Sequence, residues 1–367
     1  MATPYIDLAG GCEKILRYMG DLTKTNNPFL LGRKTGMLDA LLDPENGSIK
    51  LDLNNTQAGK KYVKSKVVYK VRAKACEILE DDDVPSICEA GNEPAENSVD
   101  VTINKHISSP VITFSNQKMI NICQDTKAFV DEYVMSYIRA LREKADEYVL
   151  AQADAAIGVN RHQNGDADTA AGAYKTKKIL GTDSTIGVTT PLFANYSDIL
   201  MDYQYNQLNG TPRLVGEGNL QKFMQLSKFS CCNADGVAYD SAIASAGAAF
   251  FLDQAANSVL GTNRFLSFAP NVLHLLWFNE NQNIGINTET ERHIVIQDPV
   301  YPKLKWDLDF RWDCNKSWNF QISAWLDLFS AYQADSFSEE ASPAGSPACD
   351  DELVGVTGVF GYTGTAV

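Results

Sequence analysis

The stretch that decides the fold runs from Thr126 to Ile157 and reads TKAFVDEYVMSYIRALREKADEYVLAQADAAI. Its apolar residues recur at intervals of three and four positions, which is the spacing of one face of an α-helix. Asp125 is suited to cap the start of this helix, and Gly158 is suited to end it. We therefore predict one helix over 126–157, about 48 Å long, that lies across a sheet.

The two faces of this helix carry different side chains. The apolar face, which we expect to be buried against a sheet of the same chain, includes Tyr137, Ile138, Leu141 and Val149. The opposite face is charged, and we expect exposure or contact with another subunit for Arg142, Glu143 and Asp146.

Ahead of the helix, residues 60–74 contain seven Lys or Arg residues and no acidic one. Apolar and basic positions alternate there, and a second alternating run follows at 99–104, which is the pattern of two strands. A polar, acidic stretch separates the two runs. This pattern predicts an extended β-hairpin over 51–115 that is too poor in apolar residues to form its own core, so we expect it to project and to pack on a neighbour.

Three roles are open for the basic strand: an exposed hairpin face, a surface that docks on an acidic region of another copy, or a nucleic-acid contact. Docking on another copy is favoured because the chain carries a net charge of −14 and complementary patches promote self-association. The candidate inter-subunit contacts are Lys64, Lys66, Lys70, Arg72 and Lys74.

The composition is that of a folded globular chain, with 367 residues of which 44% are hydrophobic and 21% charged. The acidic balance argues against a dedicated nucleic-acid binder. The longest apolar runs, such as 246–252, are too short for a membrane span, and the first residues lack the pattern of a secretory signal. The eight cysteines are scattered without a Cys-x-x-Cys pair, so we expect reduced thiols and an intracellular compartment.

The rest of the chain predicts a mixture of helices and strands. Residues 1–50 read as an arm with one short helix at 13–19. Further helices are expected at 196–208 and 242–260. Strands are expected at 176–180, 185–189, 212–215, 272–278, 354–362 and, in two alternating tryptophan-rich runs, within 304–329.

A search for catalytic motifs finds no G-x-S-x-G, H-E-x-x-H or Walker-type lysine loop. The four histidines share no spacing, and His274, in an apolar run, is expected to be a hydrogen-bonded core residue. A soluble hydrolase that uses Asp166, Asp168 or His162 remains an alternative. We expect a non-enzymatic protein without a metal, nucleotide or prosthetic cofactor.

This order of elements resembles the major capsid protein of tailed bacteriophages, the Hong Kong 97-type fold. The stretch 203–215, YQYNQLNGTPRLV, looks like the helix of that family's peripheral domain and the turn into the next strand. The resemblance implies an α+β chain with an N-terminal arm, an extended β-hairpin or extension loop, a long spine helix, a peripheral mixed α/β domain and an axial α/β domain. The implied ranges are 1–50 for the arm, 51–115 for the extension loop, 116–229 for the peripheral domain with the spine helix at 126–157, 230–307 for the axial domain, and 308–367 for a return to the sheet of the peripheral domain.

The resemblance also implies a function. The chain would be a structural subunit that assembles through hexamers and pentamers into an icosahedral capsid enclosing double-stranded DNA, built in the host cytoplasm and located in the virion. Its implied partners are further copies of itself, scaffolding, portal and decoration proteins, and packaged DNA without sequence-specific contacts, but no membrane. Only about 50 residues precede the hairpin, so we expect any scaffold to be a separate protein. An encapsulin-like nanocompartment shell, which would enclose an enzyme, is the alternative with the same fold.

Overall fold

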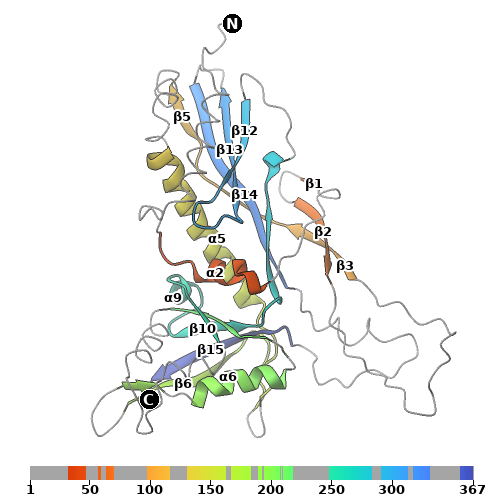
Figure 1. Ribbon diagram of the computed structural model, residues 1–367, viewed down its shortest axis with the longest axis vertical. Helices are drawn as coiled ribbons and strands as arrows, with labels where there is room; N and C mark the ends of the chain where they lie inside the picture. Colours follow the sequence, from red (N-terminus) through yellow and green to blue (C-terminus); the bar gives the residue numbers. More distant parts are fainter. Residues whose placement is uncertain are drawn as a thin grey trace, which may run out of the picture.

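The computed structural model is an α+β chain with two large sheets, a narrow ribbon and few helices (Figure 1). It describes residues 32–46, 57–58, 63–69, 97–115, 130–162, 167–182, 189–191, 194–206, 208, 210–217, 248–282, 291–312, 317–330 and 356–366. The expected helix at 13–19 lies outside these residues. The mixed α+β class expected from the sequence is confirmed.

The first large sheet has six strands in the order β7-β6-β15-β10-β8-β9. The pairs β15–β6 and β8–β9 are parallel, and the other neighbours are antiparallel. Its strands are β6 (Tyr174–Thr182), β7 (Thr189–Pro191), β8 (Arg213–Gly216), β9 (Ala249–Leu252), β10 (Arg264–Phe268) and β15 (Val359–Ala366). Helix α6 (Ala194–Tyr205) accompanies this sheet at the lower end of the molecule (Figure 1).

The second large sheet is antiparallel, with the order β11-β14-β13-β12. Two short strands, β4 (Lys105–Ser108) and β5 (Ile112–Ser115), also pair with β14. The other strands are β11 (Leu273–Phe278), β12 (Glu291–Gln297), β13 (Lys305–Trp312) and the long central β14 (Ser317–Ser330), with the short 3-10 turn η5 (Glu280–Gln282) after β11. The two tryptophan-rich runs predicted to be strands are β13 and β14, so this prediction is confirmed.

The expected hairpin is a third, three-stranded sheet with the order β1-β2-β3. It consists of β1 (Gln57–Ala58), β2 (Val63–Tyr69) and β3 (Asn97–Ile103), and we call these three strands the ribbon. Strands β2 and β3 pair antiparallel, from Val63 opposite Ile103 to Tyr69 opposite Asn97. In Figure 1 the ribbon lies beside the body, at its right.

The long helix is present as predicted and crosses the second sheet. Its described part starts with a π-helical turn, η4 (Val130–Val134), and continues as α5 (Met135–Ala155). It contacts β14 and β4, and Ile138, Leu141 and Val149 are buried as expected, whereas Tyr137 is half-buried. The helical phase predicted from the sequence is therefore confirmed for its apolar face.

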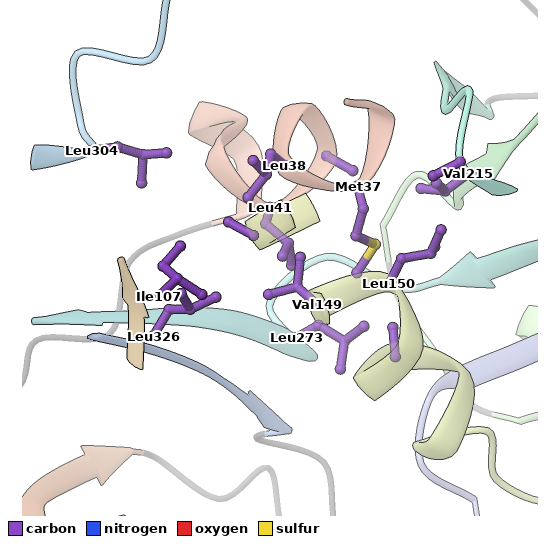
Figure 2. Packing of buried hydrophobic residues seen from close by; sticks show 14 of the residues in the cluster. Met37, Leu38, Leu41, Ile107, Val149, Leu150, Val215, Leu273, Leu304 and Leu326 are labelled. Carbon is purple, nitrogen blue, oxygen red and sulfur yellow. The ribbon is translucent and has the colours of Figure 1, made fainter. Parts of the chain in front are cut away.

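A second helix, α2 (Gly36–Leu42), lies inside the segment that the sequence predicted to be an arm. Its apolar side chains enter the main core beside α5, where Met37, Leu38 and Leu41 pack near Val149 and Leu150 (Figure 2). A seven-residue helix is too short to be stable alone, so packing and not intrinsic propensity maintains it. A short 3-10 turn, η2 (Pro44–Asn46), follows.

The predicted helix at 242–260 is wrong for its described part. Residues 249–252 form β9, which pairs with β8, and only Ala256–Val259 are helical, as α9. A short apolar run fits a strand or a helix equally well by periodicity, and here the available strand edge decided it. The Asp253 carboxylate accepts the backbone N–H of Ala255 at 2.7 Å, which favours a turn between the two elements.

The strands of the expected axial segment, 230–307, divide between the two large sheets. β9 and β10 belong to the first sheet, whereas β11, β12 and the first three residues of β13 belong to the second. Strands β14 and β15, in the expected return segment 308–367, likewise belong to different sheets. The boundaries at residues 230 and 307 stay predictions, and they do not coincide with the membership of the sheets.

Candidate functional site: the ribbon and the junctions around the long helix

The ribbon is attached to the body at the end of β3. Val101 and Ile103 are buried there in a small cluster, separate from the main core, with Leu276 and Phe278 of β11 and Trp325 and Phe329 of β14. Strand β3 then leads through Asn104 into β4, which pairs with β14. An apolar anchor and a shared strand partner therefore fix the root of the ribbon.

Asp327 of β14 joins this root to the long helix. Its Oδ2 accepts the backbone N–H of Asn104 at 3.1 Å, and its Oδ1 accepts the hydroxyl of Tyr148 on α5 at 3.2 Å. Burial, and then the charge of Asp327, raise the pKa of Tyr148 to about 12, so this hydroxyl keeps its proton and donates it. One carboxylate thus connects the ribbon, the second sheet and α5.

The register of the ribbon assigns its residues to two faces. Directly opposed residues of antiparallel strands share a face, and Ser65 is opposite the buried Val101. Successive residues of a strand lie on opposite faces, so the positions of Lys64 and Lys66 lie on the face opposite to Ser65 and Val101. This is the face of Thr102, whose side chain is exposed. Two of the five predicted contact residues therefore occupy positions on the face away from the anchor.

The other predicted contact residues, Lys70, Arg72 and Lys74, lie outside the described residues. The register also reveals an acid that inspection of residues 60–74 missed, because Asp100 of β3 stands opposite Lys66. The alternation at 99–104 was visible in the sequence, but which lysine position stands opposite which acid position depends on the register.

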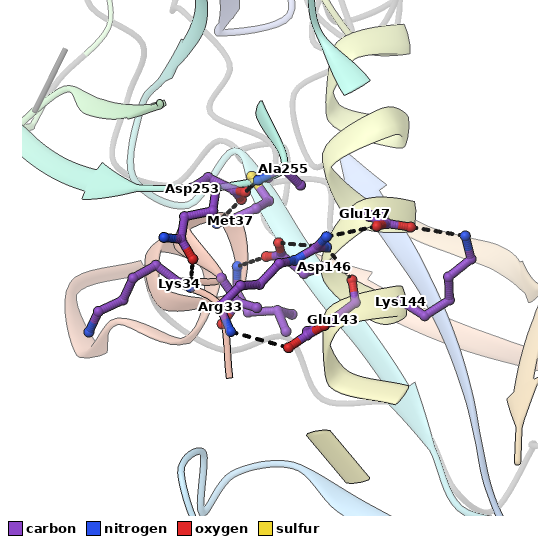
Figure 3. Close-up of polar contacts among 12 residues, drawn as sticks. Arg33, Lys34, Met37, Glu143, Lys144, Asp146, Glu147, Asp253 and Ala255 are labelled. Atoms are coloured by element: carbon purple, nitrogen blue, oxygen red, sulfur yellow. Dashed lines mark hydrogen bonds and ion pairs between the residues drawn. The ribbon is translucent and has the colours of Figure 1, made fainter. Parts of the chain in front are cut away.

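A second group of contacts holds the segment before α2 on the long helix (Figure 3). Arg33 contacts two acidic residues of α5, with its Nη1 2.8 Å from Glu147 Oε1 and its Nη2 donating to the backbone oxygen of Glu143 at 2.7 Å. The backbone N–H of Lys34 donates to the side chain of Gln254, and the N–H of Gln254 donates back to the Lys34 carbonyl. This segment therefore bridges α5 and the turn after β9.

Two carboxyl groups from distant parts of the chain cap the first turn of α2. The N–H of Met37 donates to Asp253 Oδ2 at 3.0 Å, and the N–H of Leu38 donates to Asp146 Oδ1 at 3.1 Å. Thr35, at the N-cap position, makes no capping bond with its own side chain. Negative groups at a helix N-terminus satisfy its free N–H groups and are favoured by the helix dipole.

The expected exposure of Arg142 and Asp146 is wrong. Arg142 is 3% exposed and Asp146 0%, while Glu143 is half-buried. Arg142 contacts Asp298, which lies between β12 and β13, and Asp146 contacts α2. The face of α5 that carries these residues is covered by segments far away in the sequence, which helical periodicity alone does not reveal.

His162 does not form the constellation proposed for a hydrolase. Its ring lies between Asp202 of α6, with Nδ1 2.7 Å from Oδ1, and Thr169, with Nε2 2.9 Å from Oγ1. Asp168 instead accepts the backbone N–H of His162 at 3.2 Å, and Asp166 lies outside the described residues. The His162 side chain is only 1% exposed, so a substrate has no access to its ring.

The contacts of His162 have a structural effect. Tyr362 of β15 donates its hydroxyl to Asp202 Oδ2 at 3.0 Å, so this network ties the 160–169 loop to α6 and β15. Asp202 and Thr169 are the partners that the sequence did not reveal. His274 is confirmed as a buried histidine, with Nε2 3.0 Å from the Asn271 carbonyl oxygen.

Two searches over the described residues find no candidates. No group of three or more His, Cys, Asp or Glu side chains in that part of the chain is placed to bind a metal ion. Within the same ranges, no helix combines the length and the apolar character that crossing a membrane requires.

No family model matches the sequence, and no curated protein does either. Solved structures do match. The capsid of Myoviridae phage XM1 is 12% identical with a TM-score of 0.39, and the alignment covers 87% of this chain and 93% of that one. The cyanophage A-1(L) capsid is 13% identical with a TM-score of 0.47, covering 93% and 98%. The capsid of an empty GTA particle is 13% identical with a TM-score of 0.35, covering 92% of each chain.

These structures are capsids. They are of the kind that the order of elements in the sequence resembles. All three TM-scores lie below 0.5, and the function proposed below is therefore argued from the geometry of the chain itself.

Proposed function

We propose that this chain is the structural subunit of an icosahedral tailed-phage capsid and assembles with copies of itself through hexamers and pentamers. The observation that carries the proposal is the ribbon, whose strands pair with one another and join the body through the end of β3. A narrow β-ribbon is marginally stable in water by itself, so the outer part of the ribbon requires a second surface. In a closed shell, a neighbouring copy supplies that surface.

The charge distribution supports the same arrangement. The basic run at 60–74 belongs to a chain of net charge −14, so an acidic surface on the next copy would attract it. We assign the inter-subunit contact to Lys64, Lys66, Lys70, Arg72 and Lys74. Each exposed ion pair contributes only about 0–1 kcal/mol, but the contact recurs at every copy of the lattice.

The contacts of the long helix support the same role. The long helix is fixed to the second sheet by its apolar face, to the ribbon root through Asp327, and to the connection between β12 and β13 through Asp298. Contacts of this kind keep the described elements in one arrangement, so that the same surface is presented to every neighbouring copy, as a closed symmetric assembly requires.

The remaining features of the proposal follow from this role. The shell encloses double-stranded DNA without sequence-specific contacts, forms in the host cytoplasm and is part of the virion. Scaffolding, portal and decoration proteins are its partners, the role is structural and not catalytic, and no membrane takes part.

Electron microscopy of the purified full-length chain tests the proposal. We expect closed shells, alone or after co-expression with the scaffold of the same phage. A chain that stays monomeric at high concentration with all partners supplied would overturn it. Analysis of the particle contents separates the two shell functions, because DNA supports the capsid, whereas an enclosed enzyme would assign the chain to the encapsulin-like class.

A further inference from the structure

The two carboxyl groups that cap α2 differ in how their oxygens are used. Both oxygens of Asp253 accept backbone N–H groups, Oδ2 from Met37 and Oδ1 from Ala255. Asp146 accepts only one, from Leu38 on Oδ1. Its Oδ2 is buried without a hydrogen-bond donor, and the nearest cationic nitrogen, Arg33 Nη2, is 4.0 Å away. A buried carboxylate oxygen with no donor is costly.

The surroundings favour one negative charge on the pair over two. From the N-terminal segment Arg33 and Lys34 face this region, and from α5 come Lys144 with the acids Glu143 and Glu147 (Figure 3). Arg33 already pairs with Glu147 at 2.8 Å. On the other side, residues 248–260 add no charged residue besides Asp253, and Glu217 follows β8. Around the two buried carboxyl groups, three acids therefore balance three cations, so no excess of positive charge offsets a second negative charge on the pair.

We propose that Asp146 and Asp253 share one proton, carried on Asp146 Oδ2 and donated to Asp253, and that this proton keeps residues 33–42 docked on α5 and β9. The arrangement satisfies every oxygen of the pair, because the protonated Asp146 is a donor on one oxygen and an acceptor on the other. Loss of the proton places two like charges side by side under the first turn of α2.

The direction of the pH effect follows from the protonation of the docked state. Burial, and then the charge of Asp253, raise the pKa of Asp146 far above its ordinary value, and burial also raises the pKa of Asp253. The docked segment therefore binds a proton that the detached segment releases. Docking is favoured at acidic pH and weakens as the pH rises through the raised pKa, so the segment is a pH-dependent clasp on the long helix.

Hydrogen exchange of the full-length chain, followed by mass spectrometry on a peptide that covers 36–42, tests the clasp. In the wild-type chain we expect protection, corrected for intrinsic exchange, to fall by up to tenfold per pH unit above the raised pKa. Asp146→Asn imitates the neutral acid, since the amide accepts from Leu38 and donates to Asp253, so its protection should stay at the acidic wild-type level up to pH 8.

Two further variants make the result specific. Asp253→Asn replaces one of the two carboxylate oxygens, both of which accept backbone N–H groups, by an amide nitrogen that cannot accept. Residues 36–42 of this variant should therefore exchange faster than in the wild-type chain at every pH. Asp168→Asn changes an exposed acid of the 160–169 loop, outside the pair, and should keep the wild-type pH dependence. Constant protection in the wild-type chain over the whole pH range in which it stays folded would overturn the proposal without any variant. An Asp146→Asn chain that keeps the wild-type slope, or that is already loosened at the acidic end of this range, would overturn it as well.

Discussion

Arg142 of α5 and Asp298 form an ion pair inside the molecule, with Arg142 Nη1 3.2 Å from Asp298 Oδ1. The Asp298 carboxylate also accepts the indole N–H of Trp306 on Oδ2 and the backbone N–H of Val300 on Oδ1. The residue thus fixes the connection between β12 and β13 on the long helix, and both charges are almost fully buried.

Removing one partner of this pair leaves a buried, uncompensated charge. We expect Asp298→Ala to lower the free energy of unfolding by about 3–5 kcal/mol, measured from urea denaturation. Lys144→Ala is the matched control, because it breaks a pair with Glu147 in which the lysine is 64% exposed, and it should cost about 0–1 kcal/mol. Equal losses for the two variants would contradict a structural role for the buried pair.

The phase of the long helix is tested by two adjacent substitutions. Leu141 is 6% exposed in the main core, whereas Ala140 is exposed. Both changes to Asp carry a similar cost in helix propensity, but only Leu141→Asp buries a charge. We expect Leu141→Asp to yield insoluble protein and Ala140→Asp to yield folded protein, judged by soluble expression and circular dichroism. Soluble, folded Leu141→Asp would contradict the burial of this face.

The close approach of α2 to β9 requires a glycine at position 36. A Cβ on Gly36 would lie 2.5 Å from the carbonyl carbon of Leu252. This atom belongs to the backbone of β9 and cannot move aside as the end of a flexible side chain can. We expect Gly36→Ala to destabilise the chain by about 1–3 kcal/mol and to loosen α2, measured by urea denaturation and hydrogen exchange.

Gly32→Ala is the control for this variant. Its Cβ would meet the side chains of Glu143 and Arg139, at 2.6 and 2.8 Å, which are flexible and can move. If Gly32→Ala were as destabilising as Gly36→Ala, the tight contact with the β9 backbone would not be the cause.

Asp307 of β13 should make stability depend on pH. It is 2% exposed, and burial raises its pKa to about 7. A carboxyl whose pKa is higher in the folded chain stabilises it below the unfolded value of about 3.9, and this contribution is lost as the pH rises to the folded value. We expect the urea midpoint to fall between pH 4 and pH 7, less steeply in Asp307→Asn, and with the wild-type slope in Asp168→Asn, whose side chain is 47% exposed. Equal slopes in all three proteins would exclude Asp307 as a cause.

The ribbon prediction concerns assembly and not folding. Charge reversal of Lys66, Lys70 and Arg72 to Glu should leave the far-ultraviolet circular dichroism spectrum unchanged, because the anchor is formed by Val101 and Ile103. Shell formation, followed by electron microscopy, should stop or become strongly sensitive to salt.

A triple reversal of Lys303, Lys305 and Arg311, which are exposed on and before β13, is the matched control for net charge. Wild-type-like shells from the ribbon variant would contradict docking on another copy and would indicate that the basic strand is a solvent-exposed hairpin face. Loss of assembly in both variants would attribute the effect to net charge.

Local patterns determined much of this protein. The three-and-four spacing of 126–157 predicted the long helix and its buried apolar face, and alternation predicted β2, β3, β13 and β14. These signals are readable because a side chain's direction repeats along one helix or one strand. The basic character of the ribbon is likewise a property of the sequence alone, together with the expectation that it needs a partner.

The tertiary structure decided whatever depends on two segments far apart in the chain. Arg142 and Asp146 look like solvent-facing charges until α2 and the connection between β12 and β13 cover them, and Asp100 faces Lys66 only in one register. Residues 249–252 became a strand because an edge of β8 was available. Burial and pairing between distant segments are set by the packing of the whole chain. The pattern within a short stretch of sequence therefore does not indicate which distant segment will cover it.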